Sequence, residues 1–491
     1  MSKQQASYRS IFKATSIFGG VQVFNILITL IRAKFVAVLI GATGMGLNGL
    51  YFSIINLIKS ISNLGLDFSA VRELTDSLSR ENEDEINRTY SVIRVWIWIS
   101  AILSMLITII FAPFLSQYAF GNKNYTSSVL WLSLTFLFTA LSGGVFLVLR
   151  ALRRTKELAK ANILGSAMGL LFSLPILYIY RIDGIVPSII FGSFVSFIVS
   201  MYFKKYIKLK FVKTSLKDAF ISGKPMITQG IYVSVSAYFA TLNIFLLSMF
   251  ITSYGSVADL GLFNAGQSIL AGVVGVLFSA IATDYFPRLA KVINSEMEWK
   301  DVVNHQAELL LIILPLLLMT VVLCSNFIID LLLSKEFRVI NLFLIFSTFS
   351  IPLKGITWVT GFVFSAKRNN KAMLLTELFG NLFLLVFAIV FYTYFSFIGL
   401  AYSTILAYIF NCIINFTIIN KKYNFEFSSS VKRLLIINFL VLIILISLKI
   451  YIQGYLFYVS SIVVYLVTGI YLLKELNTKI NFTDFLKSKR Q

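Results

Sequence analysis

Apolar runs of about twenty residues recur along almost the whole chain and are separated by short polar breaks. A run of that length, wound as an α-helix with a rise of about 1.5 Å per residue, crosses about 30 Å of hydrocarbon. The composition agrees, because 58% of the residues are hydrophobic and only 13% are charged, whereas soluble domains average about half and about a quarter. The sequence therefore predicts an all-α, polytopic membrane protein.

The runs predict helices and not the strands of a membrane barrel. Barrel strands alternate apolar and polar residues over about ten positions, whereas residues 439–446 are apolar on every face. One helix for each run gives about fourteen transmembrane helices. They are expected at residues 11–40, 46–71, 90–118, 126–149, 161–180, 184–203, 225–253, 256–284, 305–326, 338–365, 372–394, 397–420, 432–450 and 455–473.

The charges are unevenly distributed along the chain. The 43 lysine and arginine residues outnumber the 22 acidic ones, and most of them lie at the two termini and in the even-numbered connections between predicted helices. Basic residues beside a membrane span resist translocation and attract anionic lipid headgroups. We therefore expect both termini in the cytoplasm, anionic membrane lipids as partners, and no nucleic acid. The densest basic clusters lie at residues 150–156, 204–217 and 474–490.

Landmark residues recur at a constant offset along the chain. Gly46 is echoed by Gly261, and Gly165 by Gly380 at the same spacing, which we call the repeat offset. Topology alone would explain recurring basic loops, but it does not explain recurring glycines. We infer two six-helix lobes of the same orientation, related by a pseudo-twofold axis along the membrane normal, followed by two extra helices and a basic cytoplasmic tail. The predicted boundaries are 1–215 for the N-terminal lobe, 216–424 for the C-terminal lobe and 425–491 for the remainder.

Several basic residues fall inside predicted helices. A charge near the centre of a bilayer costs at least about 2.5–3.5 kcal/mol, so it usually faces a water-filled cavity or a partner. Lys59 and Lys354 lie near the centres of two predicted helices, and Pro352 is expected to bend the helix beside Lys354. Arg32 and Lys34 are about 200° apart around the first helix, so both cannot face one cavity unless that helix bends.

Glu377 is the clearest acidic residue inside a predicted helix. It either forms an ion pair with Lys354 or Lys371, or it binds a coupling cation or proton. Asp67 is a second candidate, although its position close to Arg72 favours a structural ion pair.

Enzyme chemistry lacks its usual motifs in this sequence. One histidine and two cysteines do not form a cluster with metal-ligand spacing, and neither a phosphate-binding loop nor a nucleophile elbow is present. The sequence therefore predicts a passive or ion-coupled carrier without a catalytic residue, a metal or another cofactor, apart from a coupling Na⁺ or H⁺.

Residues 33–47 and 331–337 resemble Wzx-type flippases for lipid-linked O-antigen units. The first stretch contains Ala-Lys-Phe-Val-Ala-Val and then Gly-Ala-Thr-Gly-Met-Gly-Leu, and the second reads Leu-Leu-Leu-Ser-Lys-Glu-Phe, followed by Lys354, Gly361 and Lys367. These non-enzymatic carriers belong to the multidrug/oligosaccharidyl-lipid/polysaccharide (MOP) superfamily, together with MurJ and the MATE drug exporters. The resemblance implies a MurJ/MATE-like fold built from the two lobes.

The resemblance also implies a function. It indicates a flippase that moves undecaprenyl-diphosphate-linked oligosaccharide, as for the O-antigen of lipopolysaccharide, from the cytoplasmic to the periplasmic leaflet of the bacterial inner membrane. Alternating access through a central cationic cavity would carry the anionic head group, and a polysaccharide polymerase and a chain-length regulator are candidate partners. Basic side chains would bind the diphosphate, and the substrate-binding candidates are Arg32, Lys34, Lys59 and Lys354.

The match to the family pattern differs between these residues. Lys34, Lys354 and Glu377 fall where Wzx-like chains carry a cation, a cation and an acid. Lys59 departs from the family pattern, so its candidacy rests on its predicted depth alone.

Two other functions stay open. A MATE-like, ion-coupled exporter of small organic cations would favour acidic side chains in its cavity, whereas the embedded bases of this chain outnumber its embedded acids. A polysaccharide polymerase or ligase would carry a large periplasmic loop, whereas the predicted outer loops are short.

Overall fold

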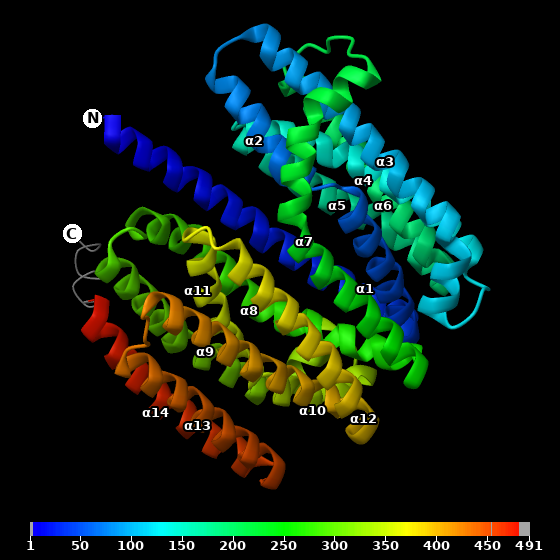
Figure 1. Ribbon diagram of the computed structural model, residues 1–491. Helices are drawn as coiled ribbons and strands as arrows, with labels where there is room; N and C mark the ends of the chain where they lie inside the picture. Colours follow the sequence, from blue (N-terminus) through cyan, green and yellow to red (C-terminus); the bar gives the residue numbers. More distant parts are fainter. Residues whose placement is uncertain (1–2, 453, 481–491) are drawn as a thin grey trace. The chain divides into compact units, whose positions relative to one another are not determined.

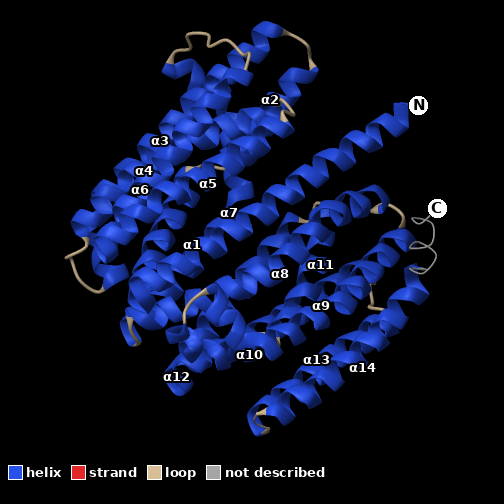
Figure 2. Ribbon diagram, turned by 180° about the vertical axis from the view of Figure 1, so that it is seen from behind, coloured by secondary structure: helices blue, strands red, loops and turns tan. Residues whose placement is uncertain are grey.

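The computed structural model describes residues 3–452 and 454–480, and these residues are helical, joined by short turns (Figure 2). Ten helical stretches of the described chain are long and apolar enough to cross a membrane, or eleven if one bent pair counts as a span. The helices are α1 (Lys3–Ser62), α2 (Leu66–Ser79), α3 (Glu83–Phe120), α4 (Thr126–Ala151), α5 (Thr155–Tyr180), α6 (Ile185–Phe203), α7 (Leu216–Tyr254), α8 (Val257–Val292), α9 (Glu296–Leu332), α10 (Asn341–Ser347), α11 (Ser350–Ala366), α12 (Asn370–Tyr423), α13 (Ser429–Tyr451) and α14 (Tyr455–Ile480), with 3-10 turns η1 (Arg181–Gly184), η2 (Lys204–Tyr206) and η3 (Lys335–Ile340).

The longest stretches contain a reversal of chain direction. α1 breaks at Gly41, which has φ 66° and ψ −167°, and Figure 1 shows its two limbs. The Arg32 guanidinium lies 5.0 Å from the centre of the Phe52 ring, although a straight helix would hold residues twenty positions apart about 30 Å from each other. The first helix of the chain is therefore a pair of antiparallel spans.

Two further stretches reverse in the same way. α12 breaks at Ser396, and the ring centres of Phe383 and Phe410 on its two limbs are 5.2 Å apart. α5 and α6 are joined only by η1, and Phe172 and Phe191 bring their ring centres within 6.4 Å. With two spans in each of the three reversing stretches, the described chain has about fourteen, as predicted.

Unusual backbone conformations recur at the repeat offset. Arg153 and Arg368 both have φ 54°, and Arg181 and Ser396 have φ 51° and φ 50°. Positive φ is uncommon outside glycine, so two such matches at one spacing confirm the parallel repeat. The hydrogen bond that closes the first turn recurs as well, from the Arg154 N–H to the Leu149 carbonyl at 2.9 Å and from the Asn369 N–H to the Phe364 carbonyl at 2.8 Å.

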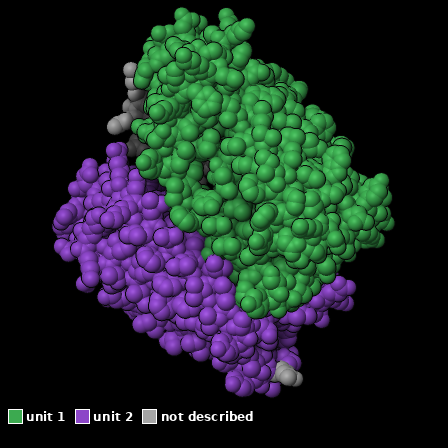
Figure 3. All heavy atoms as spheres, turned by 45° about the vertical axis from the view of Figure 1, so that its right-hand side comes forward, with its two compact units in different colours: residues 1–265 green, residues 266–491 purple. Residues whose placement is uncertain are grey.

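The chain divides into two compact units, residues 1–265 and 266–491 (Figure 3). The boundaries of the homologous lobes at residues 215 and 424 stay predictions, because compactness does not test where a repeat begins.

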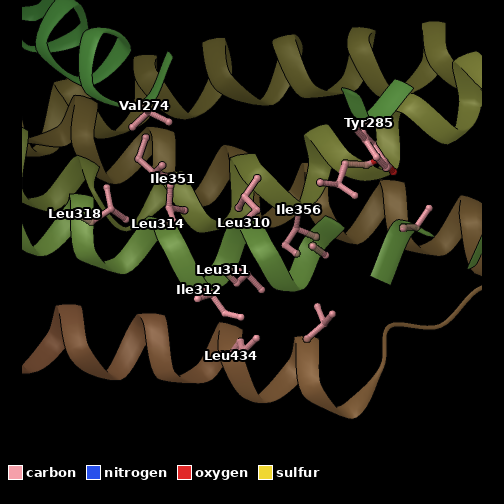
Figure 4. Close-up of a cluster of buried hydrophobic side chains, with 14 of the residues drawn as sticks. Val274, Tyr285, Leu310, Leu311, Ile312, Leu314, Leu318, Ile351, Ile356 and Leu434 are labelled. Atoms are coloured by element: carbon pink, nitrogen blue, oxygen red, sulfur yellow. The ribbon is translucent and has the colours of Figure 1, made fainter. Parts of the chain in front are cut away.

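The core of the second unit is built around α9. Leu310, Leu311 and Leu314 are fully buried, because α9 is apolar on every face over residues 309–319 and is packed by α11, α13 and α14. In Figure 4, Leu310 lies on the side of α9 towards Ile356 of α11, and Leu311 lies towards Leu434 of α13. The two extra C-terminal helices therefore complete the core of this unit.

The predicted helix at 46–71 is wrong in its second half. α1 ends at Ser62, because Leu64 and Gly65 adopt left-handed backbone conformations with φ 50° and φ 71°. α2 then starts a new direction. Lys59 consequently lies in the last turn of α1 and not near the centre of a helix.

The predicted bend beside Pro352 is confirmed. The segment Lys335–Ser347, which ends with α10, and α11 meet at 54°, with the break at Thr348 and Phe349. In a continuous helix the proline ring would clash with the carbonyl of Thr348, four residues earlier. Pro352 instead occupies the first turn of α11, where a missing N–H leaves no helical acceptor unsatisfied. Lys354 follows directly after this bend.

Candidate substrate and ion site

A cavity of about 320 Å³ opens in the second unit between α11 and the two limbs of α12. It contains a base and an acid, Lys354 from α11 and Glu377 from the first limb of α12. The remaining lining is rich in amide, hydroxyl and aromatic side chains, including Thr357, Trp358, Asn381, Tyr408, Asn411 and Asn415.

Helical spacing explains why the amides gather there. Glu377 and Asn381 are four residues apart on one limb, and Asn411 and Asn415 are four apart on the other, so each pair shares a helix face. The Asn381 amide donates to the Glu377 carbonyl at 2.8 Å, and the Asn415 amide donates to the Asn411 carbonyl at 2.9 Å. Local hydrogen bonds therefore hold these polar side chains on the cavity wall.

Gly380 allows the two limbs of α12 to approach each other beside the cavity. A Cβ at this position would lie 2.5 Å from Asn411 Nδ2. The same approach occurs one repeat offset earlier in the chain, where a Cβ on Gly165 would lie 3.1 Å from Ser196 Oγ. Both repeats thus use one packing solution, with a smaller side chain in the first.

Charge distinguishes the two repeats at this place. Counted back by the repeat offset, Glu377 corresponds to Asn162 and Lys354 to Thr139. Neither residue of the first repeat is charged, although the packing is shared. The base and the acid therefore occur in only one of the two repeats, and a site where a repeat differs from its partner is a candidate for function.

Glu377 is not held by a structural ion pair. Among the described residues, the ion pairs include neither Glu377 nor its two expected partners, Lys354 and Lys371. Both Lys354 and Glu377 are exposed. The cavity thus presents one positive and one negative side chain to whatever enters it.

Lys59 and Asp67 lie together in the first unit. They line a small cavity of about 30 Å³ with Ser100, and Asp67 accepts a hydrogen bond of 2.8 Å from the Asn63 amide. Arg72 does not pair with Asp67, because it pairs with Asp76 at 3.7 Å, one turn further along α2.

Arg32 and Lys34 lie on the first limb of α1 and line neither of these two cavities. The guanidinium of Arg32 stands over the ring of Phe52. Its Nε and Nη2 atoms are buried without a hydrogen-bond partner. Buried, unsatisfied donors are rare in folded proteins and are costly in a membrane, which keeps Arg32 a candidate for ligand contact.

Five polar or aromatic residues of the Lys354 cavity were not predicted from the sequence: Asn381, Asn411, Asn415, Tyr408 and Trp358. The signal that could have found the amides is their spacing of four inside apolar runs, since amides in hydrocarbon need partners. In the described part of the chain, no group of three or more His, Cys, Asp or Glu side chains could hold a metal ion.

Residues 35–342 match the family described as "Polysaccharide biosynthesis protein". The chain belongs to this family. A search of curated proteins returned no match.

Solved structures show the fold of this polysaccharide biosynthesis protein. The lipid II flippase MurJ in an inward closed conformation has a TM-score of 0.71 at 14% identity and covers 96% of this chain and 99% of its own. An inward-facing MATE multidrug transporter of the MOP superfamily has a TM-score of 0.65 at 14% identity, covering 83% and 96%. A mutant of the Vibrio cholerae MATE transporter VcmN has a TM-score of 0.60 at 14% identity, covering 85% and 100%. The predicted MurJ/MATE-like fold is confirmed.

Proposed function

We propose that this polysaccharide biosynthesis protein is a flippase for an undecaprenyl-diphosphate-linked oligosaccharide, such as an O-antigen repeat unit. It would carry this unit by alternating access from the cytoplasmic to the periplasmic leaflet of a bacterial inner membrane, where a polymerase and a chain-length regulator would use it. The supporting observation is the polar cavity that holds Lys354 inside a transmembrane bundle of this family. The substrate has a dianionic head and sugars that hydrocarbon excludes, while its lipid can stay in the membrane.

The chemistry of the cavity suits such a head group. Lys354 would bind the diphosphate as a point charge, and the Asn411 and Thr357 side chains would hydrogen-bond sugar hydroxyls. The ring of Trp358 would cover the apolar face of a sugar. A volume of about 320 Å³ lies at the low end for ligand pockets, which suits the diphosphate and an adjoining sugar better than a long oligosaccharide.

We further propose that Glu377 binds the coupling ion, Na⁺ or H⁺. Carboxylate and amide oxygens are the ligands that hard cations prefer, and Glu377 shares its cavity with Asn381 and Asn411. The same carboxylate supports the second candidate function, ion-coupled export of a small organic cation by a MATE-like carrier. Lys354 opposes that alternative, because its charge would repel a cationic drug.

The deciding experiment is an analysis of lipid-linked oligosaccharides in a strain that lacks the gene. If the protein is a flippase, complete units should accumulate in the cytoplasmic leaflet. There they would be protected from a sugar-modifying enzyme added on the periplasmic side of the inner membrane. Units that accumulate on the outer leaflet would indicate a polymerase or ligase. Unchanged units together with a loss of organic-cation efflux would establish the MATE-like function instead.

A further inference from the structure

A separate cavity of about 120 Å³ lies in the first unit between α3, α4 and α6. Its walls are apolar, with Ile93, Ile97, Val145, Val148, Phe197 and Met201 among them. Trp98 also lines it and is 43% exposed. Ile102, one helical turn after Trp98 in α3, is exposed, and so is Tyr202, which follows Met201 in α6. The slot therefore opens on the apolar outer surface of the helices.

Two cations lie at one end of this slot. Arg94 of α3 and Lys204 of η2, directly after α6, are both part of its lining. The Arg94 guanidinium is positioned by the ring of Phe211, whose centre lies 4.9 Å away. Neither cation takes part in an ion pair within the described residues. An apolar slot thus ends in two positive charges that form no ion pair with a carboxylate of the described chain.

The chain that follows Lys204 is fixed beside the slot. The Lys210 N–H donates to Asn87 Oδ1 at 2.9 Å, and the Val212 N–H donates to Ser91 Oγ at 2.8 Å. Asn87, Ser91 and Arg94 have the spacing of one helix face, so a single face of α3 holds both this segment and the cation of the slot. The segment presents further exposed lysines, Lys205, Lys208 and Lys213.

We propose that this slot binds an anionic phospholipid of the cytoplasmic leaflet. One acyl chain would lie between α3, α4 and α6, and the phosphate would contact Arg94 and Lys204. Basic pockets between helices on the cytoplasmic side bind anionic head groups, and the basic segment 204–217 marks this end of the first unit as the cytoplasmic side. The planar guanidinium of Arg94 offers a phosphate paired N–H donors. The site is distinct from the cavity of Lys354 and does not depend on the transported substrate.

Native mass spectrometry of the purified full-length protein tests this proposal. Phosphatidylglycerol and phosphatidylcholine with identical acyl chains are titrated in detergent, and one phosphatidylglycerol is expected to bind more tightly than phosphatidylcholine. Arg94→Gln combined with Lys204→Gln should weaken phosphatidylglycerol binding roughly 25-fold, since each cation contributes about fivefold. The matched control is Lys421→Gln with Lys422→Gln, the basic pair in the last turn of α12, and it should leave binding unchanged.

A second variant tests the acyl-chain part of the slot. Val145→Phe places a ring in the slot and should weaken the binding of both lipids. If the head group alone were bound, this substitution would leave lipid binding unchanged. Thermal unfolding verifies that each variant is folded, and Lys204→Gln alone, with an expected loss of about fivefold, replaces the double variant if that one does not fold. Equal affinity of the unchanged protein for the two lipids, or an equal loss in the control pair, would overturn the proposal.

Discussion

Gly46 and Gly261, which define the repeat offset, make the same backbone contact in the first unit. A Cβ on Gly46 would overlap the carbonyl oxygen of Val257, and a Cβ on Gly261 would overlap that of Ala42. Ala42 and Val257 are themselves separated by the repeat offset. The two contacts are therefore related by the pseudo-twofold axis of the repeat, and they use the small residues that close helix packing in membranes requires.

We predict that Gly46→Ala and Gly261→Ala each lower stability by about 1–3 kcal/mol, because the added methyl group has no room beside a carbonyl. Thermal unfolding in detergent measures the effect. The control is Gly143→Ala, which meets no atom within 4 Å and should be neutral or slightly stabilising. Equal unfolding temperatures in all three variants would show that the glycine contact is not formed.

Lys354→Ala should lower surface-polysaccharide assembly roughly tenfold or more while leaving the protein level unchanged. A charge-assisted hydrogen bond contributes about 1.5–3 kcal/mol, and its loss corresponds to that factor. Lys354→Arg keeps the charge and should retain part of the activity. Lys371→Ala removes an exposed lysine that does not line the cavity, and full assembly is expected. Wild-type assembly in Lys354→Ala would remove this residue from the site.

Glu377→Gln should reduce the dependence of transport on an imposed Na⁺ or H⁺ gradient. Glutamine preserves the shape of the side chain but carries no charge with which to bind a cation. Transport into vesicles with and without each gradient provides the measurement, and Glu336→Gln, outside the cavity, provides the control. An unchanged response to both gradients in Glu377→Gln would exclude an ion-coupling role.

Lys449 of α13 contacts α9 where that helix is irregular. Its Nζ donates to the Val322 carbonyl at 2.6 Å and to the Ser325 hydroxyl, next to the non-helical backbone of Cys324. Lys449→Met should lower stability by about 1–3 kcal/mol, because these acceptors lose their donor. Lys432→Met, an exposed lysine of the same helix, should cost much less, and a similar loss in both would refute the contact.

The fold could largely be predicted from the sequence, because hydrophobic runs report membrane spans directly. The repeat was visible for a related reason, because Gly46 and Gly261 mark places where a helix packs directly against a backbone carbonyl, and such close packing favours the smallest residue. The end of α1 at Ser62 could not be foreseen, because Leu64 adopts positive φ in surroundings that only the tertiary structure provides. Apolar residues such as Leu64, Leu66 and Phe68 follow Ser62. The pattern of apolar residues therefore predicts one continuous helix, because it carries no information about a change of chain direction.

The candidate site was predicted only in part. Lys354 and Glu377 could be predicted because a charged side chain inside a membrane span is costly and usually faces a cavity or a partner. The structure places both in one cavity. Asn411 and Asn415 were missed, because a neutral amide costs less than a charge and gives a weaker signal. The depth expected for Lys59 depended on an uninterrupted helix, and the turn after Ser62 removes that argument.

At Gly41, Arg181 and Ser396 the chain reverses within one to four residues, so these corners contain few residues outside regular helix. A protease that reaches these corners would find few extended segments to cleave, and an antibody would find few to bind. Limited digestion of intact vesicles should therefore leave these three hairpins whole.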